Sequence, residues 1–363
     1  MRRSALFAAL VLVSGCRAIA GVEDLQLTNP PCDGVATDLD NDPKNCGACA
    51  HDCLGGACSG GVCQPDLLMP LENGETVLNL SKPNAELFVL TDYEVIACLP
   101  DRCQGTIAYP VSLPQARFMD YTFVVDPQTS DIYYASVNGS GGAGKFSVRD
   151  SGPPRDIVTN LISPGQLSLA DGHLFYVDYG GQSADNGVVG TCNAPDCSTT
   201  TTLQDPSAHP FGAYLVGSDV YFIAVDESQG GPVELFKCAL ADDCATPTAI
   251  SQPGALQGFY GSLAQVSDGF VLNSFASLLH LGLDGSVKEI VTHAKSPDYL
   301  SSDGKSVVAW CDKDSLTVYT LDTSKPDAKP TAIVVETDTP VATAIDDTTV
   351  YYGTGSRVER VAR

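Results

Sequence analysis

Basic residues are scarce in this sequence. Of its 363 residues, 20 are Lys or Arg and 44 are Asp or Glu, which gives a formal net charge of -24. Such a surface repels nucleic acid phosphates and anionic lipid headgroups, so we expect no nucleic acid partner. Secreted proteins with little lysine are commonly acidic for solubility, and a surface tuned to a cationic ligand is the alternative. The net charge therefore argues against anionic partners but does not identify the partner that is bound.

Signatures of catalysis are missing as well. No serine stands in a Gly-x-Ser-x-Gly turn, no His-Glu-x-x-His motif occurs, and only one tryptophan is present. The stretch 138–145, "NGSGGAGK", lacks the Ser or Thr that ends a phosphate-binding loop, and we interpret it as a flexible loop. We therefore predict no catalytic residue, no metal site and no cofactor. The five histidines are spread along the chain: His51, His173, His209, His280 and His293.

Long apolar runs are also absent, apart from a short one near the N-terminus. Arg2 and Arg3 precede this run and small residues follow it, which is the layout of a secretory signal peptide. The run is too short to span a bilayer as a helix. We predict that residues 1–15 are removed. Loss of the two arginines changes the charge of the mature chain from -24 to -26.

The end of this segment, Val13-Ser14-Gly15-Cys16, resembles a bacterial lipobox. The resemblance implies that Cys16 becomes the lipidated first residue and that residues 16–31 form a tether. Inner-membrane lipoproteins typically carry Asp where this chain has Arg17, so an outer membrane lipoprotein of the bacterial cell envelope is implied, either periplasmic or surface-exposed. Its acyl chains, palmitate among them, are the only membrane contact we expect. An ordinary signal peptide with a coincidental cysteine is the alternative.

Thirteen further cysteines follow Cys16, and six of them crowd into residues 32–64. This segment is too short and too polar to build a hydrophobic core, so it must fold on disulfides or on metal. Cys46 and Cys49 have the spacing of a zinc knuckle, with His51 nearby. An exported chain meets oxidising conditions, however, and six cysteines close as three bridges. We predict a disulfide module whose pairing the spacing leaves open, made by Cys32, Cys46, Cys49, Cys53, Cys58 and Cys63.

The stretch "DLDNDPKNCGACAHDCLGGACSGGVC" is similar to the cysteine-rich stigma-specific family in its Asn-Cys-Gly-x-Cys core and its closing Cys58 to Cys63. The resemblance implies a secreted extracellular module with no known catalysis. The same stretch has the alternating carboxylates of a calcium loop, but Pro43 replaces the required glycine and Cys49 stands where a bidentate Glu is needed. We interpret these aspartates as an acidic solvated turn.

From residue 65 onward the chain repeats a unit of four short strands. The second strand of each unit is aromatic or β-branched, and an Asp or Gly turn often precedes it, as at Asp303-Gly304 and Asp346-Asp347. Seven such strands begin at residues 87, 132, 174, 220, 270, 307 and 350.

A period in the forties with four strands per unit is the signature of a β-propeller. We predict an all-β fold in which residues 65–363 form a seven-bladed β-propeller of four-stranded blades. The repeats are similar to the degenerate YWTD- or NHL-type propeller repeats of bacterial lipoproteins and secreted proteins. The last unit has only three strands, so residues 65–71, "PDLLMPL", are predicted to add its outer strand and close the ring. A ring closed by packing alone is the alternative.

Three cysteine pairs each frame the loop between the third and fourth strands of a unit. A disulfide across such a hairpin pins the outermost strand to its blade. Successive blades hold the pairs apart, which disfavours a shared zinc site. We predict the disulfides Cys98–Cys103, Cys192–Cys197 and Cys238–Cys244. Cys311, on a second strand, is left as a buried free thiol, with a reactive or intermolecular thiol as the alternative.

The function that best fits this sequence is a lipid-anchored, envelope-exposed binding or scaffolding protein that uses one propeller face to recognise a protein, peptide or glycan. We expect a monomer. A metal-assisted enzyme of the lactonase or glycan lyase type, with Asp and His gathered at the central channel, is the alternative, and a purely structural envelope protein is the third possibility.

Overall fold

The computed structural model describes residues 32, 37–71, 75–101, 103, 107–110, 123–137, 144–149, 155–180, 187–203, 209–225, 232–256, 259–274, 277–292 and 297–363. The chain divides into two compact units between Gln64 and Pro65. The predicted signal peptide, Cys16 and the tether lie outside the described residues, as does His293. Within the described part, no helix is long and apolar enough to cross a membrane.

The first unit is organised by three disulfides: Cys32–Cys49, Cys46–Cys58 and Cys53–Cys63. Its regular structure is a short hairpin of β1 (Cys58–Ser59) and β2 (Val62–Cys63). The cysteines supply most of its buried apolar surface, which is what a short polar segment requires. The disulfide-rich N-terminal region is therefore confirmed, and the structure supplies the pairing that spacing left open.

A tight backbone contact explains the glycine in the Asn-Cys-Gly motif. Gly47 has a φ of +70°, and a Cβ placed there would lie 2.4 Å from the carbonyl oxygen of Gly61. The carboxylates of Asp38 and Asp42 accept hydrogen bonds from backbone N–H groups two residues further on, at Asp40 and Lys44. These two aspartates therefore fix local backbone turns.

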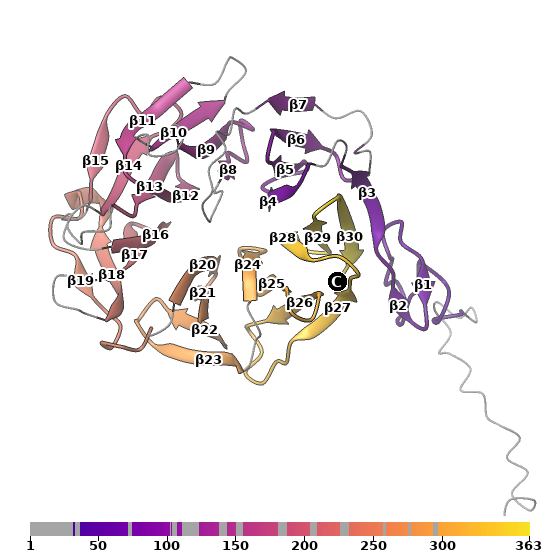
Figure 1. The fold of residues 1–363 in the computed structure, drawn as a ribbon. Coiled ribbons are helices and arrows are strands. Elements are labelled where there is room, and N and C mark those ends of the chain that lie inside the picture. Colours follow the sequence, from indigo (N-terminus) through magenta and orange to yellow (C-terminus); the bar gives the residue numbers. More distant parts are fainter. Residues whose placement is uncertain are drawn as a thin grey trace, which may run out of the picture. The chain divides into compact units, whose positions relative to one another are not determined.

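The second unit is all-β, and its described strands form seven four-stranded sheets. In six of them four consecutive strands pair in order, each antiparallel to the next. Figure 1 shows these sheets around a common centre, with the first strand of each nearest to it. The predicted β-propeller of four-stranded blades is confirmed.

The first three sheets contain the strands between residues 77 and 202. They are β4 (Val77–Ser81), β5 (Leu87–Thr91), β6 (Glu94–Cys98) and β7 (Ile107–Pro110); β8 (Phe123–Val125), β9 (Ile132–Val137), β10 (Gly144–Arg149) and β11 (Arg155–Leu161); and β12 (Pro164–Ala170), β13 (His173–Asp178), β14 (Val188–Asn193) and β15 (Thr200–Thr202).

The next three sheets contain the strands between residues 209 and 335. They are β16 (His209–Val216), β17 (Asp219–Val225), β18 (Val233–Ala239) and β19 (Thr248–Ala249); β20 (Phe259–Val266), β21 (Gly269–Ser274), β22 (Ser277–Gly282) and β23 (Val287–Thr292); and β24 (Pro297–Ser302), β25 (Val307–Asp312), β26 (Thr317–Asp322) and β27 (Thr331–Val335). A 3-10 turn, η2 (Leu240–Asp242), follows β18.

The last sheet joins the two ends of the propeller unit. It consists of β28 (Pro340–Ile345), β29 (Thr349–Thr354), β30 (Arg357–Ala362) and β3 (Asp66–Pro70). The strand β3 is the segment predicted to close the ring, and it pairs antiparallel with β30 from Asp66 opposite Arg360 to Pro70 opposite Arg357. This pairing gives the outer edge of β30 a partner from the start of the unit.

The second strand of each sheet is apolar because neighbouring sheets cover both of its faces. All six residues of β25 and of β29 are buried. One core cluster packs Phe175 and Val177 of β13 against Phe222 of β17, and another packs β5 against β28 and β29. Burial of one such aromatic side chain stabilises a fold by about 1.5–3 kcal/mol. The core is therefore a series of interfaces between sheets.

Three disulfides cross hairpins of this unit: Cys98–Cys103, Cys192–Cys197 and Cys238–Cys244. Each joins the third strand of a sheet to the connection that leads to the fourth, and each pair has a Cα–Cα distance of 4.9 Å. Cys311 on β25 is buried and is not part of a disulfide, and its Sγ lies 3.8 Å from the carbonyl oxygen of Ala342.

Candidate binding cleft

The short turns between the first and second strands lie along one edge of the ring. Consecutive strands alternate in direction, so the connection between the third and fourth strands emerges at the same edge. The three disulfide hairpins therefore share this edge with the turns. We call it the turn face.

Three of these turns line an open cleft of about 580 Å³, which we call the turn cleft. They connect β4 to β5, β24 to β25, and β28 to β29. A volume of this size lies within the range of ligand pockets, about 300–1,000 Å³. The lining combines charged and small polar residues: Lys82, Pro83, Asn84, Ser302, Asp303, Gly304, Lys305, Ile345, Asp346, Asp347 and Thr348.

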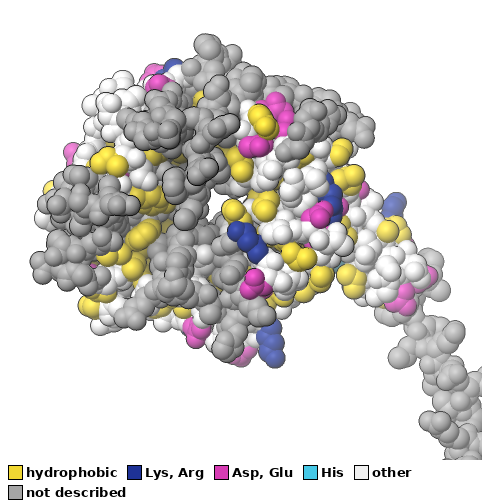
Figure 2. Space-filling model, viewed as in Figure 1, with side chains coloured by type: hydrophobic (Ala, Val, Ile, Leu, Met, Phe, Trp, Pro, Cys, Tyr) yellow, Lys and Arg dark blue, Asp and Glu magenta, His cyan; other side chains and the backbone are white. Residues whose placement is uncertain are grey.

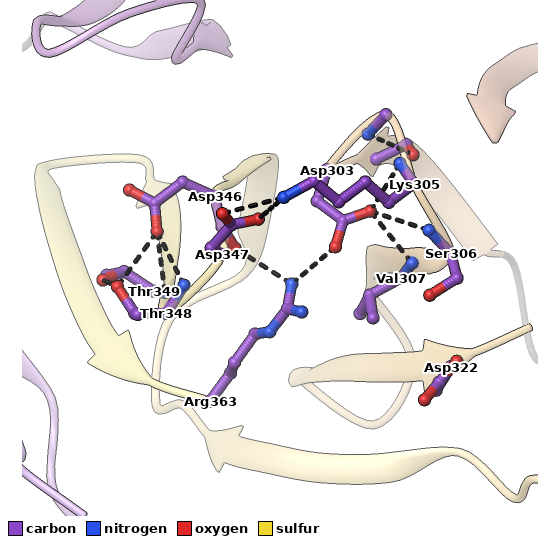
Figure 3. Close-up of polar contacts among 12 residues, drawn as sticks. Asp303, Lys305, Ser306, Val307, Asp322, Asp346, Asp347, Thr348, Thr349 and Arg363 are labelled. Carbon is purple, nitrogen blue, oxygen red and sulfur yellow. Dashed lines mark hydrogen bonds and ion pairs between the residues drawn. The ribbon is translucent and has the colours of Figure 1, made fainter. Parts of the chain in front are cut away.

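The turn after β24 is organised by the carboxylate of Asp303, which is only 2% exposed. Its Oδ1 accepts hydrogen bonds from the backbone N–H groups of Lys305, Ser306 and Val307 at 2.9–3.0 Å. Its Oδ2 accepts one from the Arg363 guanidinium at 2.9 Å (Figure 3). Burial opposes ionisation of Asp303, but these donors outweigh it and lower the pKa of the carboxyl group.

The turn after β28 uses its two aspartates differently. Asp346 Oδ1 accepts the backbone N–H groups of Thr348 and Thr349 at 3.0 and 2.9 Å, while its Oδ2 accepts the hydroxyl of Tyr351 at 3.0 Å. Asp347 points outward, and both of its oxygens contact Lys305 Nζ, at 2.6 and 2.8 Å (Figure 3). One aspartate thus fixes the turn and the other joins it to the neighbouring turn.

Lys82 is the cation that lies deepest in the wall of the cleft, with a side chain only 8% exposed. Its Nζ donates to the carbonyl oxygen of Asn84, lies 4.0 Å from Asp346 Oδ2 and sits 6.0 Å from the centre of the Tyr351 ring. Burial lowers the pKa of Lys82, and the charge of Asp346 acts against that decrease.

The same contacts link turns of adjacent sheets. Lys82 reaches from the turn after β4 to Asp346, and Lys305 reaches from the turn after β24 to Asp347. The carbonyl oxygen of Lys305 accepts the N–H of Ser267 in the turn before β21, at 2.7 Å. The Asn84 amide donates to the Pro127 carbonyl oxygen in the turn after β8, at 3.3 Å. The cleft is therefore part of a connected set of turns.

The centre of the ring differs from the turn cleft in the contacts that its inner strands make. Figure 2 shows one face of the molecule, with a gap at the centre of the ring and Lys or Arg side chains beside it. Side chains of the inner strands bond across sheets near this centre: Ser168 Oγ donates to the Ala213 carbonyl oxygen, and Ser301 Oγ donates to Thr343 Oγ1. These neutral contacts hold neighbouring inner strands together.

The cysteines predicted as site residues have structural positions. None of the described ones lines the turn cleft, although the three hairpin disulfides share its face, and Cys16 lies outside the described residues. His173 begins β13, and His280 on β22 contacts Asp268 at 3.1 Å. Among the described residues, one group of three side chains lies close enough together to share a metal: Cys46, Cys53 and Cys63. These three cysteines are bonded in disulfides.

Sequence reasoning did not single out the residues of the cleft. Asp303-Gly304 and Asp346-Asp347 were recognised as hairpin turns, which was the available signal. Lys82 and Lys305 carried no motif. Only the closure of the ring, which brings the first turn of the unit beside its last, places Lys82 next to Asp346.

No family model and no curated protein matches this chain. Its fold is similar to that of virginiamycin B lyase from Staphylococcus aureus, with a TM-score of 0.60 and 11% identity over 82% of this chain and 97% of that chain. It is also similar to the extracellular domain of a one component system from B. thetaiotaomicron, with a TM-score of 0.57 and 11% identity over 82% of this chain and 39% of that chain.

A third similar structure is the computationally designed Ika8 protein, with a TM-score of 0.51 and 12% identity over 82% of this chain and 99% of that chain. At these identities the likeness shows the fold alone, which is of the propeller type. The six disulfides are those of a protein that matures in an oxidising compartment outside the cytoplasm.

Proposed function

We propose that this protein is a recognition propeller of the bacterial cell envelope that binds a protein, peptide or glycan ligand at the turn cleft. The observation that carries the proposal is the convergence of three turns from different sheets on one cleft of about 580 Å³. Loops held by a rigid scaffold are the usual place for binding residues in proteins of this architecture.

The sheets supply that rigidity. The turn after β24 is fixed by the hydrogen bonds of Asp303, and the turn after β28 by those of Asp346. Preorganised groups lose little conformational entropy when a ligand binds. We further propose that the seven sheets are the blades of a single ring, because the sheet that contains β3 packs against the sheet of β4 to β7.

The lipid anchor belongs to the same proposal. Val13-Ser14-Gly15-Cys16 has the residues of a lipobox, and Arg17 favours the outer membrane. An acylated Cys16, joined to the first unit by residues 16–31, would hold the propeller at the membrane surface as a monomer. Metabolic labelling with a palmitate analogue should mark the wild-type chain and leave a Cys16→Ala variant unmarked. Labelling of both chains, or of neither, would contradict the lipid anchor and would leave the proposed binding site unaffected.

The binding site is tested by blocking the cleft. Thr348 is exposed and lines it, so Thr348→Trp places a large ring there and keeps every charge. Ser218→Trp is the matched control, because Ser218 is an exposed residue of the turn between β16 and β17, outside the cleft.

The assay is binding of the full chain, purified in detergent, to arrays of peptides and glycans. We expect Ser218→Trp to keep the wild-type ligands and Thr348→Trp to lose them by about tenfold or more in affinity, the effect of 1.4 kcal/mol. Equal binding by the two variants would rule out the turn cleft as the recognition site.

A further inference from the structure

We propose that the turn cleft recognises an oxyanion, a carboxylate, sulfate or phosphate group of its ligand, and holds it between Lys82 and Lys305. The inference rests on the proposed function for the location of the site. It goes further by naming the chemical class of the group that is bound.

The first argument is that the carboxylates of the cleft already have donors. Asp303 accepts three backbone N–H groups and the Arg363 guanidinium. Asp346 accepts two backbone N–H groups and the Tyr351 hydroxyl. Both oxygens of Asp347 accept hydrogen bonds from Lys305 Nζ. Asp303 and Asp346 therefore have a donor on each oxygen, and a cationic ligand at the exposed Asp347 would compete with Lys305 Nζ.

The second argument is that the ammonium groups keep unused donors. An ammonium has three N–H groups and no acceptor. Among the described residues, Lys82 Nζ has one hydrogen-bond acceptor, the Asn84 carbonyl oxygen, because Asp346 Oδ2 is 4.0 Å away and outside hydrogen-bond distance. Within the same described part of the chain, Lys305 Nζ contacts one residue, Asp347, and its side chain is 66% exposed. Both ammonium groups therefore keep N–H donors for an acceptor group of the ligand.

The third argument concerns the burial of Lys82. A cation with only 8% of its side chain exposed loses hydration, and Asp346 at 4.0 Å compensates for that loss only in part. An oxyanion placed beside Nζ would restore the missing hydrogen bonds, and hydrogen bonds between charged partners are roughly twice as strong as neutral ones. A neutral hydroxyl would do so less well.

Amine reactivity provides the test. The full chain is treated with acetic anhydride at low reagent concentration, and acetylation of Lys82, Lys305 and Lys325 is quantified by mass spectrometry with inorganic phosphate, sulfate or citrate present. Chloride at the same ionic strength is the baseline. Lys325 is the internal control, because it is 72% exposed, pairs with Asp322 and lies outside the cleft.

At a free anion concentration of nine times Kd, we expect acetylation of Lys82 and Lys305 to slow about tenfold, since protection equals 1 + [L]/Kd. Lys325 should be unchanged. The anion with the strongest protection identifies the source of the oxyanion. The proposal is overturned if none of the three protects Lys82 and Lys305, or if Lys325 is protected equally.

Three variants, one of them a control, extend the test without replacing Lys82, which is packed in the wall of the cleft. Lys305→Gln should weaken protection of Lys82, whereas Lys325→Gln should not. Asp347→Asn frees Lys305 from its ion pair, so it should lower the Kd of the anion about two- to fivefold, the range of one exposed ion pair. An unchanged or raised Kd in Asp347→Asn would contradict the assigned role of Lys305.

The two proposals fail in different ways. If Thr348→Trp abolishes ligand binding on the arrays but no oxyanion protects the lysines, the cleft is the site and the oxyanion assignment is wrong. If oxyanions protect the lysines but Thr348→Trp binds array ligands as Ser218→Trp does, the oxyanion site exists and the recognition function lies elsewhere.

Discussion

At the scale of residues, the contacts around Tyr352 affect how a neighbouring carboxyl group binds a proton. The hydroxyl of Tyr352 on β29 lies 2.6 Å from Glu336 Oε1 and 2.9 Å from Glu359 Oε2. The two carboxyl groups thus share one hydroxyl donor, and their charges would repel each other if both were ionised. Arg357 contacts both glutamates and also Asp338. Burial and the nearby charge of Glu336 raise the pKa of Glu359 above its ordinary value, against the opposing effects of Tyr352 and Arg357.

This raised pKa predicts a pH dependence of stability. A carboxyl group whose pKa is higher in the folded state stabilises the fold fully below its unfolded pKa, and this contribution is lost as pH rises through the folded pKa. Glu359→Gln should therefore flatten the decline in Tm as pH rises from the ordinary glutamate pKa of 4.5. Melting curves over that pH range, with Glu234→Gln on β18 as the control, check this. An equal pH slope in wild type and Glu359→Gln would contradict it.

At the scale of elements, the third hairpin disulfide secures a short outer strand. Strand β19 has two residues, Thr248 and Ala249, both exposed, and few ladder bonds hold it to β18. The bridge between Cys238 and Cys244 closes a loop next to this pairing. The disulfide therefore replaces stability that a longer strand would provide.

Replacing both cysteines, as in Cys238→Ala with Cys244→Ala, should lower the free energy of unfolding. The chain-entropy estimate for so short a loop is about 2 kcal/mol. Both sulfurs also belong to the buried core cluster with Phe222, which adds lost packing. Chemical denaturation measures the change, and hydrogen exchange should show it first in β19. A loss below about 0.5 kcal/mol would contradict the role of the disulfide as a staple.

The elements also show where prediction from sequence succeeds and where it stops. The second strands expected from residues 174, 220 and 307 correspond to β13, β17 and β25, because full burial on both faces leaves a continuous apolar run. The disulfide pairing of the first unit was not predictable, since spacing does not determine which cysteines meet in space. A strand can be recognised from the local pattern of its residues, whereas disulfide pairing depends on which cysteines meet in the folded chain.

At the scale of the whole propeller unit, closure decides both stability and the site. Arg360 on β30 contacts Asp66 of β3 at 2.9 Å and Asp101 of the first disulfide hairpin at 3.0 Å, with its side chain only 12% exposed. The two ends of the unit are thus joined by backbone pairing and by one guanidinium. The same closure brings Lys82 beside Asp346 and completes the turn cleft. No local sequence pattern indicates that Lys82 and Asp346 lie together, so the cleft could not be predicted from the sequence.

Arg360→Met should therefore weaken closure and lower the free energy of unfolding by about 1.5–3 kcal/mol, the range for a partly buried charged hydrogen-bond partner. Arg155→Met is the matched control, because Arg155 pairs with Asp196 at the surface, where an ion pair contributes about 1 kcal/mol at most. Urea denaturation compares the two variants. Equal losses would show that Arg360 has no special part in closure.

Ligand binding at the turn cleft can be located by a hydrogen–deuterium exchange footprint. The full chain is compared with and without the ligand that the arrays select. We predict slower exchange of the turn amides at 84, 303–305 and 346–348, which come from three sheets. Slower exchange confined to the opposite edge of the ring, as at 336–339 and 355–356, with no change in these turns, would contradict it.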